Sequence, residues 1–421
     1  MDDSRGFLKA YVRVVAVFAG LIAVFNGVID PFGLFVAPTL EGVNAAKPRI
    51  QGYIRMVKAH QLVRVRPRGL ILGSSRAENG LDPDHPGWLP EHRPVYNAAL
   101  PSARIYEAYH YLRHAQAQNR LRQVVLGVDE FMFDDHFPYE PGFALDRLDP
   151  QPRRWPNPAR IKDYLTALWS YDALSASIDT WLHQGRPAPA YLANGSQDSR
   201  RRRELVLSKG GHHAAFEAAI TASLQSRDGL AKVSYGGRDG GEGEALKWFD
   251  ALVRFCGEER IDLYVFISPV HAQWLEALWK LGKWEAYERW KRDLVRIVEA
   301  QAARAPATAR LELWDFSGFT AITQETVPPA GDSATEMRWY WEASHYKRAT
   351  GKLVLDRMLG SKASADLPEF GVRLTSANLR SHLSGIRQQL ARYEREQPGA
   401  VEFVSRAITR IMPGQTESAS R

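Results

Sequence analysis

Five short apolar runs, separated by segments of helical periodicity, constrain the fold of this chain more than any other feature. They occupy residues 69–75, 95–100, 123–130, 262–270 and 311–318. Apolar runs of this length without strict alternation are typical of strands buried on both faces of a parallel sheet. Because amphipathic patterns lie between most of them, the sequence predicts an α/β fold with a doubly wound, mostly parallel sheet of five strands.

Two segments fall outside this alternation. Residues 133–232 are rich in proline and arginine, then helical, then loop-like. We expect them to form a helical insertion that caps the sheet edge or one side of a cleft. Residues 361–421 predict a helical C-terminal appendage, with Thr375 or Ser376 as a helix cap and a disordered tail. The main domain is then expected over residues 37–360.

The N-terminus carries an apolar segment at residues 14–29, in which Asn26 is the strong exception. About 20 apolar residues cross a bilayer as a helix, and further apolar residues extend the segment upstream. Three basic residues precede it: Arg5, Lys9 and Arg13. The positive-inside rule therefore predicts a cytoplasmic N-terminus. No clear small-residue cleavage site follows, so residues 1–36 are expected to be an uncleaved anchor rather than a signal peptide.

This anchor predicts a single-pass protein of the inner (cytoplasmic) membrane, with its main domain facing the periplasm or exterior. A buried N-terminal helix of a soluble protein is the alternative.

The 55 basic and 48 acidic residues give the chain a mild net charge of +7. The one dense basic run, residues 199–206, predicts a solvated helix face or loop rather than a phosphate clamp, so no nucleic-acid partner is expected. Cys256 stands alone, which excludes intrachain disulfides, and its apolar neighbours place it in the core.

Polar residues follow each predicted strand. They are Ser74, Ser75, Arg76, Asn97, Ser102, Asp129, Glu130, Ser268, His271 and Asp315, and a further pair, Glu342 and His345, precedes the last helix of the main domain. Ligands of open parallel sheets bind at the carboxyl ends of the strands. The sequence therefore predicts a site at this edge.

A serine acts as a nucleophile only beside a base that an acid orients, and Glu342 and His345 provide such a pair at spacing i, i+3. Ser75 is favoured over Ser74 because successive strand side chains point to opposite faces. Other interpretations remain open at this stage. Ser75 can serve only as a helix cap, the Glu342–His345 pair can be a surface ion pair, and Arg76 can bind a substrate anion or form a structural ion pair.

Four motifs together resemble the SGNH/GDSL hydrolase superfamily. They are "GSSR" after the first strand, "YNAALPS" after the second, "GVDE" after the third, and the acidic-x-x-His pair. The resemblance spans roughly residues 69–359. It is closest to the membrane-anchored, extracytoplasmic branch, which includes proteins of D-alanyl-lipoteichoic acid synthesis and of alginate O-acetylation. It implies a three-layer sandwich, with Ser75 as nucleophile, His345 as base and Glu342 in place of the usual triad aspartate.

The resemblance also assigns residues to the oxyanion and substrate region: Arg76, Asn97, Ser102 and Asp129. Ser102 stands where the family has a glycine whose backbone N–H binds the oxyanion. Asp129 stands where the family has an asparagine donor. Losing one donor costs about 2.7–4 kcal/mol in the barrier, unless Asp129 is protonated or Arg76 compensates.

The resemblance implies a membrane-anchored serine esterase or O-acyltransferase that acts on acyl groups, foremost acetyl, of an envelope or secreted polysaccharide. No metal or cofactor is expected, and a multi-spanning membrane acyltransferase is the implied protein partner. The departures at Asp129 and Glu342 leave an alternative: a catalytically inactive accessory protein that binds polysaccharide or such an acyltransferase.

Overall fold

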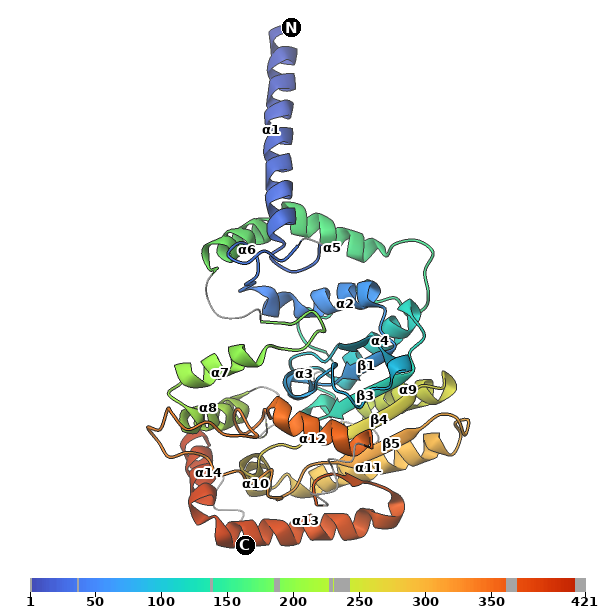
Figure 1. Cartoon of the computed structure of the whole chain (residues 1–421), viewed down its shortest axis with the longest axis vertical. Coiled ribbons are helices and arrows are strands. Elements are labelled where there is room, and N and C mark those ends of the chain that lie inside the picture. Colours follow the sequence, from blue (N-terminus) through green and yellow to red (C-terminus); the bar gives the residue numbers. More distant parts are fainter. Residues whose placement is uncertain are drawn as a thin grey trace.

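A six-stranded sheet forms the centre of the molecule (Figure 1). The computed structural model describes residues 2–35, 38–136, 139–184, 190–226, 230, 243–360 and 369–412. The strand order is β2-β1-β3-β4-β5-β6. The strands are β1 (Gly69–Leu72), β2 (Val95–Asn97), β3 (Gln123–Val128), β4 (Asp262–Ile267), β5 (Leu311–Asp315) and β6 (Val372–Arg373). The predicted α/β class is confirmed, and each of the five predicted runs contains a strand.

The expectation of five strands is wrong, because β6 adds a sixth strand antiparallel to β5 at the sheet edge. The other five strands run parallel, so the sheet is mixed. A two-residue strand leaves no periodicity in the sequence, which is why it was missed. Gly371 allows the chain to enter it: its φ is +89°, and a Cβ there would lie 2.2 Å from the Phe316 ring.

Helices form two groups around the sheet. The first contains α2 (Ile54–Val65), α4 (Ile105–Gln118), α9 (Glu244–Glu258) and α11 (Trp284–Ala302), which pack in that order, one against the next. The second pairs α3 (Ser75–Gly80) with α12 (Arg348–Met358). The right-handed crossover rule assigns α3 and the connecting helices α4, α9 and α11 to opposite faces, since β2 and β3 lie on opposite sides of β1. Cys256, on α9, is buried as predicted.

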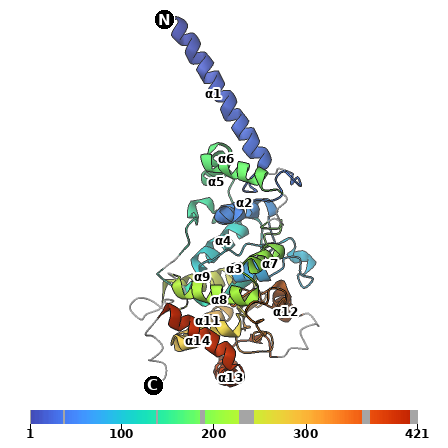
Figure 2. The ribbon, with the colours of Figure 1, turned by 90° about the vertical axis from the view of Figure 1, so that its left-hand side faces the viewer.

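Helix α1 (Asp2–Ile29) projects from the body, and only its last turns meet other elements (Figures 1 and 2). It is long and apolar enough to cross a membrane. Most of its side chains are exposed. The alternative prediction, a buried N-terminal helix, requires most of them to be buried. At its base lie α5 (Pro158–Trp169) and α6 (Tyr171–Leu182) from the insertion.

The remaining helices join the insertion to the C-terminal segment. They are α7 (Ser199–Ser208), α8 (His212–Gln225), α10 (Ala272–Lys280), α13 (Ser376–Glu396) and α14 (Pro398–Ile411), with short 3-10 helices at Ile50–Tyr53, Pro90–His92, Glu130–Phe133 and Leu145–Arg147. Helix α14 packs against both α8 and α10. Thr375 caps α13 in a capping box with Asn378, which confirms the predicted cap. The tail expected to be disordered, residues 414–421, lies outside the described residues.

Candidate active site

The nucleophile candidate, Ser75, occupies a sharp turn between β1 and α3. Gly73 makes the turn possible: its φ is +139°, and a Cβ there would lie 2.7 Å from the Gly127 carbonyl oxygen. Ser74 is the N-cap of α3, and its hydroxyl accepts the Arg76 N–H at 3.1 Å. Ser74 is fully buried, whereas Ser75 begins the helix and is only half-buried. The two adjacent hydroxyls therefore have different surroundings.

Ser75, His345 and Glu342 lie together in a hydrogen-bonded series. The Ser75 Oγ and the His345 Nε2 are 2.8 Å apart, and the His345 Nδ1 bonds a carboxylate oxygen of Glu342. The other carboxylate oxygen accepts the Ser344 N–H at 2.7 Å. A backbone bond from the Trp341 N–H to the His345 carbonyl, at 2.9 Å, closes the turn that carries the pair. The arrangement is that of a serine, a base and an orienting acid.

The charges around the pair suit a neutral imidazole beside an ionised carboxylate. Burial raises the pKa of Glu342, but His345, the Ser344 N–H and Arg202 outweigh it and lower that pKa to about 2. Burial, and then the positive charge of Arg202, lower the pKa of His345, while Glu342 opposes them. A base with a lowered pKa is unprotonated at neutral pH and can accept a proton.

Arg202 is a site residue that the sequence did not reveal. It lies on α7, within the basic run expected to be solvated, and Arg200, Arg201 and Arg203 of that run are indeed exposed. Arg202 instead donates from Nε to Asn79 Oδ1 at 2.7 Å and to Gln197 Oε1 at 2.8 Å. Asn79 in turn donates to the Ser75 carbonyl at 2.6 Å. Nothing in the local pattern distinguishes Arg202 from its neighbours, because only folding of the insertion brings it here.

Arg76 and Asp129 form a buried ion pair. The Arg76 Nη1 lies 2.7 Å from Asp129 Oδ1 and 3.2 Å from Glu130 Oε2. Its guanidinium carbon lies 4.7 Å from the centre of the Trp274 ring. Burial lowers the pKa of Arg76, but the two carboxylates outweigh it and raise that pKa. The Ser74 hydroxyl donates to the second Asp129 oxygen. Both Asp129 oxygens accept hydrogen bonds, so this side chain is not an oxyanion donor here.

Asn97 and Ser102 also have defined positions. The buried Asn97 amide donates to backbone carbonyls at the end of α3, among them Ala77 O at 3.2 Å, and accepts the Ala99 N–H at 3.1 Å. Asn97 therefore holds the turn around α3 and uses both ends of its amide for this. Ser102 is exposed and has a φ of +52°, in the left-handed region that glycine favours. It thus keeps a glycine-type backbone at the position where glycine was expected.

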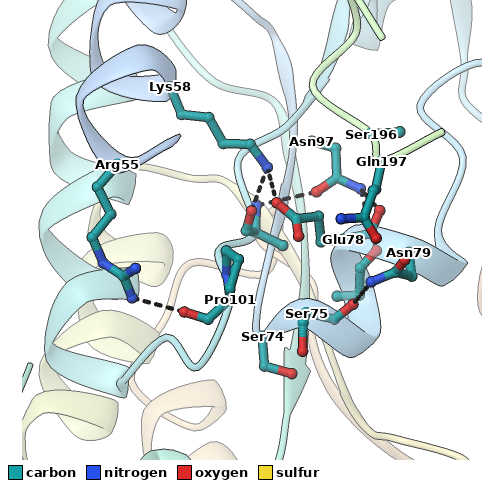
Figure 3. Close-up of polar contacts among 12 residues, drawn as sticks. Arg55, Lys58, Ser74, Ser75, Glu78, Asn79, Asn97, Pro101, Ser196 and Gln197 are labelled. Carbon is teal, nitrogen blue, oxygen red and sulfur yellow. Dashed lines mark hydrogen bonds and ion pairs between the residues drawn. The ribbon is translucent and has the colours of Figure 1, made fainter. Parts of the chain in front are cut away.

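Two basic residues of α2 hold the loop that leads to Ser102 (Figure 3). Lys58 donates to Glu78 at 2.8 Å, both side chains being fully buried, and also to the Ala99 carbonyl. Arg55 donates to the Pro101 carbonyl at 2.8 Å. Burial lowers the pKa of Lys58, and Glu78 opposes this. The pair ties α2, α3 and the 99–101 loop into one polar network beside Ser75.

Removing Lys58 should destabilise the fold, because the buried Glu78 carboxylate would lose its cation. We expect Lys58→Met to lower the free energy of unfolding by about 3–5 kcal/mol. The double variant Lys58→Met/Glu78→Leu, which removes both charges, should recover most of this loss. Denaturant titration of the full chain in detergent measures both. Equal losses in the single and double variants would show that packing, not charge, is responsible.

The other strand-end residues do not join the series. Asp315 pairs with Lys291 at 2.6 Å and with His382 at 2.9 Å, and the His271 ring bonds the Glu325 carbonyl at 2.8 Å. Two grooves of about 960 Å³ each also lie elsewhere, one between α11 and α13 and one beside the base of α1. Neither groove is lined by Ser75, His345 or Glu342. The candidate site is therefore identified by the hydrogen bonds among these three residues and not by the size of a cavity.

No protein-family model and no curated protein matches this chain.

Proposed function

We propose that this protein is a membrane-anchored serine esterase or O-acyltransferase that acts on acyl groups, foremost acetyl, of an envelope or secreted polysaccharide. The observation that carries the proposal is the series from Ser75 through His345 to Glu342. It joins residues that are far apart in the sequence and gives a serine hydroxyl the two neighbours that activate it. Helix α1, with Arg5, Lys9 and Arg13 in its N-terminal half, supports an anchor in the inner membrane with the main domain on the periplasmic or outer side.

In the proposed reaction, the Ser75 Oγ attacks the acyl carbonyl carbon as its proton moves to the Nε2 of His345. Glu342 accepts the Nδ1–H and stabilises the imidazolium that forms. His345 then gives this proton to the departing alcohol oxygen, which leaves an acyl ester on Ser75. A water molecule or a sugar hydroxyl then attacks this ester and loses its proton to His345, and His345 passes that proton to the Ser75 Oγ as the bond between Oγ and the acyl carbon breaks. Water gives an esterase, and a sugar hydroxyl gives an acyltransferase.

The proposed oxyanion donors are two backbone N–H groups. The N–H of Ser75 lies in the first turn of α3, where helix amides have no intrahelical acceptor. The N–H of Ser102 lies in the exposed left-handed turn. The third donor of the SGNH/GDSL pattern is missing, because Asp129 occupies its place and bonds Arg76. We therefore expect turnover about 10²- to 10³-fold below that of a site with all three donors.

The substrate class and the protein partner rest on the resemblance to the anchored SGNH/GDSL branch. In that branch the hydrolase-like domain works beside a multi-spanning membrane acyltransferase in modifying polysaccharides. The proposal includes such an acyltransferase as the protein partner. This protein would either receive acyl groups from the acyltransferase or pass acyl groups to it. A short acyl group such as acetyl needs no large apolar pocket beside Ser75.

Covalent labelling tests the proposal directly. The full chain in detergent is incubated with a fluorophosphonate probe, and the labelled residue is located by peptide mass spectrometry. The expected result is label on Ser75, together with hydrolysis of 4-nitrophenyl acetate. Heat-denatured protein is the control for non-specific reaction. Absence of label on Ser75 in folded protein contradicts the proposal.

A second candidate is an accessory protein that binds polysaccharide or a membrane acyltransferase without catalysis. The specific observation in its favour is that Asp129, an acceptor, stands where the related enzymes have a donor. An accessory protein of this kind would bind acylated oligosaccharide, but it would neither react with the fluorophosphonate probe nor hydrolyse 4-nitrophenyl acetate. The labelling experiment thus separates the two candidates.

The pH dependence of labelling should reflect the position of Arg202. His345 must be unprotonated to activate Ser75, so the labelling rate should rise with pH. Because burial and Arg202 lower the His345 pKa, the midpoint should lie below the value of about 6.5 of an exposed histidine. Arg202→Gln removes one of these causes and should move the midpoint upward. The matched control, Arg203→Gln, alters an exposed arginine paired with Glu336 and should leave the midpoint in place. Equal midpoints in all three proteins would contradict the assignment.

A further inference from the structure

The outward face of α5 and α6 is unusually apolar for a surface. Large apolar side chains are exposed along both helices and just before them: Trp155, Ile161, Tyr164, Leu165, Trp169, Tyr171, Ile178, Trp181 and Leu182. Contiguous apolar surfaces of this kind mark a protein or membrane interaction site. We call this surface the α5–α6 platform.

Two charged side chains of α5, Arg160 and Asp163, point inward, whereas Lys162 and Asp172 are exposed. Arg160 pairs with Asp149 at 2.5 Å. Asp163 pairs with Arg147 at 2.6 Å and with His60 at 2.9 Å. Arg160 and Asp163 are buried, whereas a helix at a water-facing surface places its charges outward. On the exposed side of the two helices large apolar side chains therefore outnumber charged ones, as in helices that lie at the boundary between lipid and water.

The two helices that carry the platform lie against the base of α1 (Figures 1 and 2). The Trp169 indole N–H donates to the Ala19 carbonyl at 3.1 Å. The Asn26 amide, the polar exception in the apolar segment, donates to the Leu168 carbonyl at 2.9 Å. The rings of Phe25 and Trp181 meet edge to face, 6.4 Å between centres. The platform therefore lies along the last turns of α1, and the Trp169 side chain reaches furthest up it.

The geometry of an α-helix shows how deep in the bilayer the contact between Trp169 and Ala19 would lie. Ala19 precedes the end of α1 at Ile29 by ten residues, about 15 Å along a helix axis. This is about half of the roughly 30 Å hydrocarbon thickness of a bilayer. Moving the membrane span toward the N-terminus does not avoid the overlap, because it would bring Arg13 and Lys9 into the hydrocarbon, where charges are costly. If α1 spans the bilayer, Trp169 must enter it.

We propose that the α5–α6 platform is a second membrane-embedded element, which lies in the leaflet on the side of the main domain with its outer face in lipid. Tryptophan and tyrosine suit the boundary of this leaflet, where their rings are apolar and their polar atoms reach the headgroups. At the greater depth of Ala19, the Trp169 indole N–H has the Ala19 carbonyl as its acceptor. The occupant of the surface is thus the acyl-chain and headgroup boundary of the bilayer. The inference rests on α1 spanning a membrane, which belongs to the proposed function, and adds a second contact that no single helix provides.

The platform would fix the catalytic domain relative to the membrane. Asp163 of α5 bonds His60 of α2, and α2 also carries Lys58, which bonds the Ala99 carbonyl beside Ser75. These buried contacts form a direct connection from the platform to the loop next to the candidate nucleophile. A site held in this way faces substrates at a set height above the lipid surface, rather than moving freely on a single helix.

Spin-label accessibility of the full chain tests the proposal. The chain contains one native cysteine, the buried Cys256, and a Cys256→Ala background allows single labels. Labels are placed at the exposed platform positions Leu165 and Leu182, with Val17 on α1 and the exposed Ala391 on α13 as references. The protein is reconstituted in vesicles of phosphatidylethanolamine and phosphatidylglycerol. Dissolved oxygen concentrates in lipid, and a nickel chelate concentrates in water.

We expect oxygen to relax the labels at Leu165 and Leu182 several-fold more than the nickel chelate does. The label at Val17 should behave in the same way. At Ala391 the nickel chelate should relax the label more than oxygen does. Nickel accessibility at the platform equal to that at Ala391 would overturn the proposal and leave the anchor intact. Protection from both reagents with an immobilised spectrum would also overturn it, since a second copy or another protein would then cover the platform. Water exposure at Val17 would overturn both the anchor and the platform. Fluorophosphonate labelling of the same samples reports independently on Ser75.

Discussion

Replacing Ser75 by alanine is expected to abolish fluorophosphonate labelling and to lower ester turnover by about a million-fold. Loss of a triad serine has an effect of this order, because the base and acid then have no nucleophile to act on. Ser75 is half-buried, and its Oγ bonds His345, so the change removes one hydroxyl without opening the core. Rates with 4-nitrophenyl acetate and the mass of labelled peptides measure the effect. Unchanged thermal unfolding would show that the fold survives.

The matched control is Ser74→Ala, one residue away. The Ser74 hydroxyl accepts the Arg76 N–H and donates to Asp129, and it is fully buried. Its loss removes a helix cap, which typically costs about 1 kcal/mol of stability. Label on Ser75 should nevertheless remain. If Ser74→Ala abolishes labelling while Ser75→Ala retains it, the assignment of the nucleophile is wrong by one residue.

Much of the fold was predictable because the strands leave strong local patterns. The run that ends at Leu72 is fully buried, and so is the whole of β3. Continuous burial requires continuous apolar sequence, which is visible without a structure. The positions of Ser75, Asn97 and Asp129 follow from the same strands, since each comes at or directly after a carboxyl end. Parallel strands bring such residues to one edge whatever the details of packing.

The remainder depends on contacts between distant segments. Arg76 was left open as an anion ligand or a structural residue, and only the packing of β3 beside β1 shows that Asp129 takes its charge. Arg202 and Lys58 reach the site from the insertion and from α2, and neither carries a local signal. The two-residue β6 is too short for periodicity, and its pairing with β5 is decided by tertiary packing. The outward apolar face of α5 and α6 is likewise recognisable only when the inward ion pairs are known.

The acid of the triad provides the second large expected effect. Glu342→Gln keeps the size of the side chain but can hold His345 in the wrong tautomer, and it cannot stabilise the imidazolium. Turnover should fall about 10⁴-fold, as for triad acids in general. Glu342→Asp keeps the charge and retracts the carboxylate by about 1.5 Å, one bond length. A displacement near 1 Å already costs about a hundredfold, so this variant should have intermediate activity. Initial rates with 4-nitrophenyl acetate rank the three proteins.

One outcome would contradict this role for Glu342: full activity in Glu342→Gln together with an inactive His345→Ala. Another carboxylate would then have to orient His345. The two strand-end candidates are already engaged, since Asp129 bonds Arg76 and Asp315 bonds Lys291 and His382. Either would have to exchange a buried cation for a neutral imidazole, which costs more than it gains in a medium of low dielectric constant. Full activity in both Glu342→Gln and His345→Ala would exclude the triad itself and favour the accessory binding protein.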